Sequence, residues 1–218
     1  MRFPQVMDEG SCARIVAAIY RARAQWTANF AGVQFTLGRA WYTHFEEDRE
    51  DEYFEGAAAS DAVVEAAVPG LQALLLEAVG RHLGAPVAQR PGWCGPGVHI
   101  FPAGSQVARR GGEVHFDTEG MSDAQLAERL PCMSFVMMFQ MPEYGGGLRV
   151  SDRFYDGEDF PEMPGPRVPS STVHYGTGEL VAFDAYRLHQ IQSFRGDRDR
   201  VSATVHVLFE DGQWLAWF

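Results

Sequence analysis

The chain has 218 residues, 46% hydrophobic and 22% charged, which is the composition of an ordinary globular protein. All 18 cationic side chains are arginines, so the absence of lysine excludes lysine Schiff-base enzymes as well as the phosphate-binding lysine of P-loop proteins and kinases. A net charge of −11 argues against nucleic acids and anionic membranes as partners.

The N-terminal part of the chain has helical periodicity. Apolar residues recur at helical spacing over 9–30, and Ser11 is a candidate N-cap. The alanine- and leucine-rich stretch 57–83 predicts two further helices, because Pro69 and Gly70 interrupt it. These segments predict a helical layer over about 1–93 that supports a sheet.

A dense acidic run, EEDREDE, occupies 46–52. Such a run usually forms a solvated helix face or loop. The alternative is an acidic lip that attracts a cationic substrate, and the sequence leaves both interpretations open.

From about residue 94 the sequence predicts short strands separated by glycine- and proline-containing turns, with a short capped helix over 122–130. The proline-rich segment 156–170 reads as an irregular loop, a candidate lid. The fold class predicted is α+β: a double-stranded β-helix (jelly roll, cupin-like) core over about 94–218, joined to the helical layer in a single domain, 1–218. The predicted strands are 97–102, 113–116, 133–141, 147–150, 172–175, 179–184, 187–193 and 200–209.

The three cysteines, Cys12, Cys94 and Cys132, form no CxxC pair. An odd number at wide spacing argues against a disulfide framework and a zinc ribbon. The first 30 residues contain no charge-free apolar run of signal-peptide length, and no stretch reaches 18 apolar residues. We therefore expect a soluble, cytoplasmic protein, and the sequence predicts no oligomeric state.

One histidine stands in a distinctive context, His115-Phe116-Asp117 at the end of a predicted strand. Residues i and i+2 of a strand share a face, so the imidazole of His115 and the carboxylate of Asp117 emerge side by side. His189, in another predicted strand, completes a set of two histidines and one carboxylate. This set leaves coordination positions open and suits non-haem Fe(II) that binds a co-substrate and O2.

A candidate carboxylate receptor follows downstream. Arg200 and Ser202 share one face of a predicted strand, which His206 continues. A guanidinium beside a hydroxyl can bind a carboxylate through charge-assisted hydrogen bonds. A dicarboxylic keto acid could then chelate iron at one end and contact Arg200 and Ser202 at the other. Alternation places Arg198 on the same face, so it is the second candidate for this role.

These motifs together resemble the 2-oxoglutarate/Fe(II) oxygenase superfamily. The resemblance rests on HIFPAGS at 99–105, HFD at 115–117, GGGLRV at 145–150, GELVAFDAYRLHQI at 178–191 and the following R-x-S, and it covers about 97–210. It implies a double-stranded β-helix whose iron ligands are His115, Asp117 and His189. It also implies that Arg200, assisted by Ser202, binds the distal carboxylate of 2-oxoglutarate.

The resemblance implies hydroxylation of an unactivated C–H bond of a small molecule, with consumption of O2 and release of succinate and CO2. More faintly, the chain resembles bacterial enzymes that hydroxylate or halogenate free amino acids, which makes a free or cationic amino acid the expected substrate. A peptidyl or carrier-bound residue is the alternative. Thr118, Glu119 and His206 are candidate substrate contacts, although Thr118 and Glu119 also suit a turn or cap.

A different class of function remains possible on these residues. The chain could be a cupin-like metal-dependent isomerase or hydrolase, or a ligand-binding β domain. The pair Arg200 and Ser202 separates the two hypotheses, because a hydrolase has no use for a keto-acid receptor.

Overall fold

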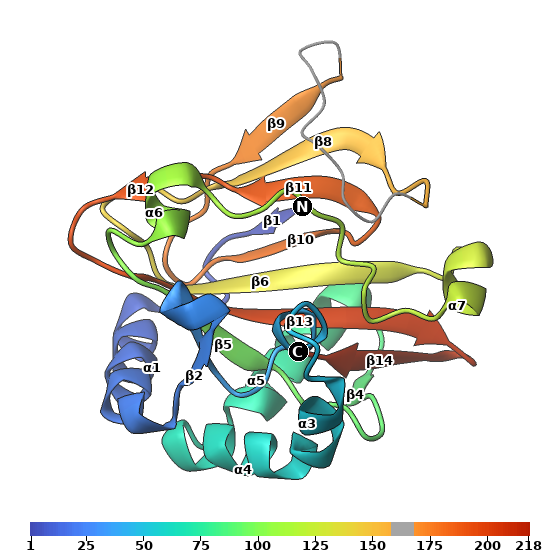
Figure 1. The fold of residues 1–218 in the computed structure, drawn as a ribbon, viewed down its shortest axis with the longest axis horizontal. Coiled ribbons are helices and arrows are strands. Elements are labelled where there is room, and N and C mark those ends of the chain that lie inside the picture. The colour runs from blue at the N-terminus through green and yellow to red at the C-terminus, as the bar shows by residue number, and fades with distance from the viewer. Residues whose placement is uncertain (158–167) are drawn as a thin grey trace.

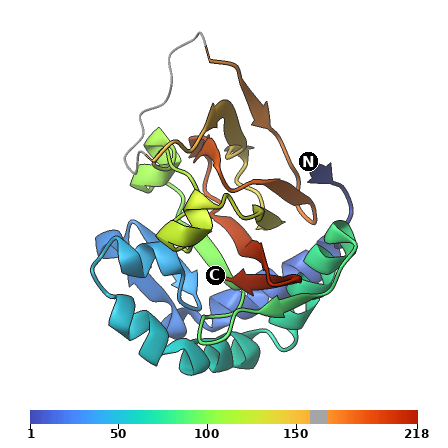
Figure 2. The same cartoon turned by 90° about the vertical axis from the view of Figure 1, so that its right-hand side faces the viewer.

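Two facing β-sheets and a layer of helices build the molecule (Figure 1). This computed structural model describes residues 1–157 and 168–218. The helices α1, α4 and α5 cover the outer face of the larger sheet, and the smaller sheet lies on its other side (Figures 1 and 2).

The first helix, α1, runs over Glu9–Arg21. Asp8 caps it by accepting a hydrogen bond from the backbone of Ser11, so the prediction of Ser11 as the cap is wrong by one turn. The predicted continuation to residue 30 is also wrong. After Arg21 the chain forms a 3₁₀ turn and then pairs as a strand.

The two helices expected over 57–83 are confirmed as α4 (Ala57–Ala67) and α5 (Leu71–Leu83). Gly70 between them has φ +77°, a left-handed conformation that favours glycine. No single helix in the described ranges has the length and apolar character to cross a membrane, although α4 and α5, bent at 96°, pass that test as a pair. The short helices are α2 (Trp41–Phe45), α3 (Glu50–Glu55), α6 (Gln106–Arg110) and α7 (Asp123–Ala127).

The larger sheet has the strand order β1-β10-β6-β13-β5-β3-β2, with β14 paired to β13 and to β4. Four of its strands precede residue 94, so the helical layer expected over 1–93 also contributes strands that the sequence did not predict. The bounds are β1 Arg2–Phe3, β2 Thr27–Asn29, β3 Gln34–Leu37, β4 Val87–Gln89, β5 Gly97–Phe101, β6 Cys132–Gln140, β10 Leu180–Asp184, β13 Arg200–Glu210 and β14 Gln213–Trp217.

The smaller sheet has the order β11-β8-β9, with β11 at Arg187–Ile191, β8 at Leu148–Phe154 and β9 at Ser170–Val173. A two-stranded pair, β7 (Tyr144–Gly145) and β12 (Phe194–Arg195), lies at its end. The strand predicted over 113–116 is wrong: only an isolated bridge between His115 and His189 forms there. Of the candidate lid 156–170, residues 158–167 lie outside the described part of the chain.

Apolar side chains fill both sides of the larger sheet. Ile19, Leu71 and Leu75 from the helices pack against its outer face. A second cluster, between the two sheets, includes Val136 and Leu148. Polar side chains also face this space between the sheets, and they define the site described next.

Candidate metal centre and cavity

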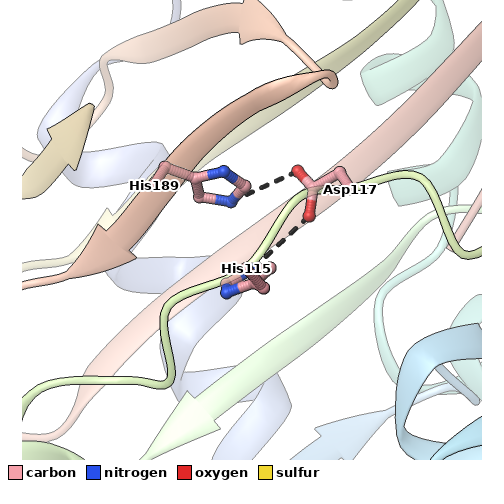
Figure 3. Close-up of side chains that lie close together, drawn as sticks. All are labelled: His115, Asp117 and His189. Atoms are coloured by element: carbon pink, nitrogen blue, oxygen red, sulfur yellow. Dashed lines mark ion pairs between the residues drawn. The ribbon is translucent and has the colours of Figure 1, made fainter. Parts of the chain in front are cut away.

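His115, Asp117 and His189 converge between the two sheets (Figure 3). Each offers one ligand atom, and these atoms lie within 4.8 Å of one another. The Nε2 atoms of His115 and His189 lie 3.5 Å from the two oxygens of the Asp117 carboxylate, one histidine on each oxygen. The geometry therefore brings together the three residues that the sequence singles out as metal ligands.

Backbone hydrogen bonds hold the two chain segments in register. His115 and His189 exchange N–H to O bonds of 3.1 and 3.0 Å, and the Asp117 amide donates to the Ala185 carbonyl at 2.9 Å. His189 belongs to β11, whereas His115 and Asp117 lie on an extended segment that only bridges to it (Figure 3). Two-residue spacing along this segment directs both side chains toward β11.

The tautomer of each histidine is set by a second hydrogen bond. The Nδ1 of His115 donates to the Glu113 carbonyl, and the Nδ1 of His189 donates to the Arg187 carbonyl, both at 2.9 Å. Each Nε2 is then free to act as a ligand. Two imidazoles and one carboxylate suit a divalent transition metal.

The charges of the centre are strongly coupled in the metal-free protein. Burial raises the pKa of Asp117, but the charges of His189 and His206 and hydrogen bonds from the histidines lower it well below its usual range. Burial lowers the pKa of His115, but the hydrogen bond to Asp117 and its charge outweigh this and raise the pKa to about 9. The His115 imidazole therefore holds a proton near neutral pH that a metal ion would have to displace.

Asp117 has a further partner that the sequence did not reveal. The hydroxyl of Ser134, on β6, donates to Asp117 Oδ2 and lies 3.0 Å from the Nδ1 of His206, from which it accepts. Burial lowers the pKa of His206 below its usual value. Ser134 thus orients the carboxylate, and His206 orients Ser134.

A cavity of about 500 Å³ opens beside the three residues. Arg200, Ser202, Thr204 and His206 line it from alternate positions of β13, as the period-two pattern predicts. His99 and Phe101 of β5 extend the same wall, because Ser202 pairs with His99 and Arg200 with Phe101. Val136, Leu148, Phe183 and Ile191 make the apolar part of the lining.

Arg200 is a buried cation with neutral partners. Its side chain is 1% exposed and donates to the hydroxyls of Ser202 at 2.9 Å and Tyr175 at 2.5 Å, and to the Gly146 carbonyl at 3.3 Å. No carboxylate in the described ranges lies within ion-pair distance of it. A buried charge without a counter-charge is unfavourable, so this cavity suits the carboxylate of a ligand.

Arg198 lies outside the cavity. Its side chain is 59% exposed and faces Glu143 at 4.0 Å. The expectation that it shares a face with Arg200 is wrong, since β13 begins at Arg200 and Arg198 lies in the preceding bend.

The three candidate substrate contacts differ in whether they line the cavity. His206 lines the cavity. Thr118 and Glu119 do not: the Thr118 carbonyl accepts from Met121 in a turn, and the Glu119 carbonyl accepts from the indole of Trp41. Their backbone positions fit the alternative role in a turn.

Several lining residues come from parts of the chain to which the sequence assigned no site. Gln34 and Tyr42 reach the cavity from the N-terminal layer, together with Glu46 of the acidic run. Tyr175, which accepts a hydrogen bond from Arg200, was expected only as a strand residue. Only the acidic-lip interpretation of 46–52 gave a signal for any of these residues, because the others lie far in the sequence from the metal-ligand and Arg200 motifs.

No family model and no curated protein matches the sequence. Solved structures do match. An N-substituted L-amino acid dioxygenase from Burkholderia ambifaria AMMD is similar with a TM-score of 0.58 at 10% identity, over 98% of this chain and 84% of that one. The α-ketoglutarate-dependent epimerase SnoN of nogalamycin biosynthesis has a TM-score of 0.56 at 16% identity, over 97% and 81% of the two chains.

A 2OG-Fe(II) oxygenase family member from Burkholderia pseudomallei has a TM-score of 0.52 at 13% identity, over 94% of this chain and 81% of that one. At these identities the likeness concerns the fold. The two-sheet architecture, the helical layer and the arrangement of His115, Asp117 and His189 thus lead to one conclusion: the chain has the fold of the 2-oxoglutarate/Fe(II) oxygenases.

Proposed function

We propose that this protein is an Fe(II)- and 2-oxoglutarate-dependent oxygenase that hydroxylates an unactivated C–H bond of a small molecule, a free amino acid. The single observation that carries the proposal is one cavity lined both by the group His115, Asp117 and His189 and by Arg200, a buried cation with no carboxylate at ion-pair distance in the described ranges. The strand arrangement is then the double-stranded β-helix of such enzymes, and the protein acts in the cytoplasm.

The residues present fit both cofactors. His115, Asp117 and His189 would hold the iron through Nε2 and carboxylate oxygen atoms. When bound, the iron couples O2 to the oxidative decarboxylation of 2-oxoglutarate and to oxidation of the substrate. Solved structures of the Burkholderia dioxygenase with α-ketoglutarate, and of SnoN with Fe³⁺ and α-ketoglutarate, support this assignment by analogy.

The chain's own contribution is to bind and orient. Arg200 and the hydroxyls of Ser202 and Tyr175 form a receptor for the distal carboxylate of 2-oxoglutarate. The apolar lining beside it limits the access of water, which strengthens this charge pairing. The keto acid is thereby aligned with the metal ligands before substrate enters.

Two other outcomes remain to be tested against this proposal. SnoN is an epimerase and a similar structure, SnoK, is a carbocyclase, so the fold also hosts α-ketoglutarate-dependent reactions other than hydroxylation. A cupin-like isomerase, hydrolase or binding protein would need no keto-acid receptor, and Arg200 argues against it.

The experiment has two stages. Anaerobic addition of Fe(II) and 2-oxoglutarate should produce a weak visible charge-transfer band. Admission of O2 with a library of free amino acids should then yield succinate, with a product heavier by one oxygen in mass spectra. Absence of the band and of succinate overturns the oxygenase class, whereas succinate with an epimerised or cyclised product overturns hydroxylation alone.

Ser134→Ala tests the hydrogen-bond chain behind Asp117. Removing the hydroxyl leaves the carboxylate less firmly oriented, so the affinity for Fe(II) should fall by about 10–100-fold, the range typical of such partners. Equilibrium dialysis under anaerobic conditions measures this. Ser171→Ala, an exposed serine on β9, is the matched control, and equal affinities for the two variants would show that Ser134 does not position the ligand.

The proton on His115 predicts a pH dependence of metal binding. Because its pKa is about 9 in the metal-free protein, the imidazole is protonated below that pH and must lose the proton to bind iron. The apparent affinity should rise by roughly tenfold per pH unit up to about pH 9 and then level off. Calorimetry in buffers of different ionisation enthalpy should detect about one proton released per metal at pH 7.5. A pH-independent affinity contradicts this assignment.

A further inference from the structure

Charged side chains surround the opening of the cavity. Arg110, Glu46 and Glu113 all line it and are also exposed, which places them at its mouth. Arg110 ends α6, and Glu113 follows it on the way to His115, while Glu46 follows α2 from the opposite, N-terminal layer. Two separate parts of the chain thus bring two carboxylates and one guanidinium to a single opening.

None of these three side chains has an ion-pair partner in the described part of the chain, although the charge of His115 acts on Glu46. In the described ranges, no carboxylate forms an ion pair with Arg110, and no arginine forms one with Glu46 or Glu113. Burial raises the pKa of Glu46, and the negative charge of Glu113 raises it further. Like charges at a partly desolvated mouth repel each other, and a cation between them removes that repulsion.

A second, independent feature favours a polar ligand in the cavity. The side chain of His99 is 6% exposed and lines the cavity, and in the described ranges its buried Nδ1 has no hydrogen-bond partner. Burial lowers the pKa of His99 to about 3, so the ring is neutral and offers one donor and one acceptor. A buried polar group without a partner is unfavourable, and a half-turn of the ring would bring this nitrogen toward a polar ligand in the cavity.

The charges at the mouth define the chemistry that complements them. Arg110 matches a carboxylate, because a guanidinium binds one through two parallel hydrogen bonds. Glu46 and Glu113 match ammonium groups. Two carboxylates and one guanidinium complement one carboxylate and two amino groups, whereas a purely anionic ligand would meet the two glutamates and a neutral one would leave all three charges unpaired.

We propose that this mouth selects a basic α-amino acid, whose carboxylate binds Arg110 and whose two amino groups bind Glu46 and Glu113. The inference rests on the proposed function, since it names the substrate class of the same site. The chain's net charge of −11 favours the approach of such a cation.

Binding is tested with L-lysine and with two probes that each lack one of its charged groups. L-Lysine carries all three groups, L-norleucine lacks the side-chain ammonium, and cadaverine lacks the carboxylate. Titration calorimetry is run on the protein loaded anaerobically with Fe(II) and 2-oxoglutarate and, separately, on the metal-free protein. L-Lysine should bind at least about tenfold more tightly than either of the other probes, the effect of one charge-assisted contact.

The variants assign each contact. Arg110→Gln should weaken L-lysine and L-norleucine by at least about tenfold and leave cadaverine unaffected. The double variant Glu46→Gln/Glu113→Gln should weaken L-lysine and cadaverine to a similar extent. Arg109→Gln and the double variant Asp51→Asn/Glu55→Gln are matched controls, since they remove the same numbers of charges from exposed residues that do not line the cavity.

The outcomes separate the two proposals. If L-norleucine binds as tightly as L-lysine, or the cavity variants behave like their controls, the inference is wrong, while a charge-transfer band with 2-oxoglutarate still supports the oxygenase. If the band and succinate are absent but L-lysine binds selectively to the metal-free protein, the oxygenase proposal fails. The inference that the mouth binds a basic amino acid is then retained.

Discussion

Replacing Arg200 by alanine is expected to raise the dissociation constant of 2-oxoglutarate at least about hundredfold. The guanidinium is buried, and its hydrogen-bond partners in the described ranges are two hydroxyls and a carbonyl, so the variant would bring a ligand carboxylate into a buried receptor without its counter-charge. Removing one partner of a buried ion pair costs about 3–5 kcal/mol, and 1.4 kcal/mol corresponds to a factor of ten. Anaerobic titration of the visible band measures the change.

Arg198→Ala is the control for this prediction. The exposed Arg198 contacts Glu143 outside the cavity, so its removal should leave 2-oxoglutarate affinity within about twofold, as for surface charges generally. Fe(II) binding should persist in both variants, because neither arginine is a metal ligand. The opposite pattern, a loss of affinity in Arg198→Ala alone, would show that Arg198 and not Arg200 binds 2-oxoglutarate.

Asp117→Asn should lower Fe(II) affinity by more than the 10–100-fold expected for Ser134→Ala, since it changes a ligand rather than the group that orients one. The amide keeps the shape of the side chain but removes the negative charge and one acceptor oxygen. In the metal-free protein the same variant should also lower the pKa of His115, because the charge of Asp117 holds it up.

Two measurements check the Asp117 prediction. Anaerobic dialysis gives the metal affinity, and NMR titration of the His115 ring gives its pKa without any metal. Asp197→Asn, at an exposed bend, is the matched control. Full metal affinity in Asp117→Asn would show that this carboxylate is not the third ligand.

The sequence predicts the strands of the central sheet well where the strand-type run is long. β6, β10 and β13 follow from runs of five or more residues that are mostly apolar. The strands β1 and β2 have two and three residues, too few for a period to emerge, and tertiary pairing alone determines them. This is why part of the predicted helical layer belongs to the sheet.

The same distinction holds within the site. The i, i+2 spacing of His115 and Asp117 places both beside His189, although their segment is not a regular strand. Ser134 and Tyr175 could not be found in this way, because Ser134 approaches its partner from β6 and Tyr175 from the loop after β9, and their neighbours in sequence carry no motif. Local pattern predicts which residues share a face, and sheet register determines which faces meet.

The attachment of His115 and Asp117 has a kinetic consequence. Backbone hydrogen bonds from the amides of Gly112, His115, Asp117 and His189 join their segment to the β11 region, and among residues 1–157 and 168–218 no strand pairs with its other side. If these bonds open together, two of the three ligands leave at once. The rate of metal dissociation would then be set by this one backbone opening and not by the stepwise loss of individual ligands. Amide exchange at His115 and Asp117 reports that opening rate directly.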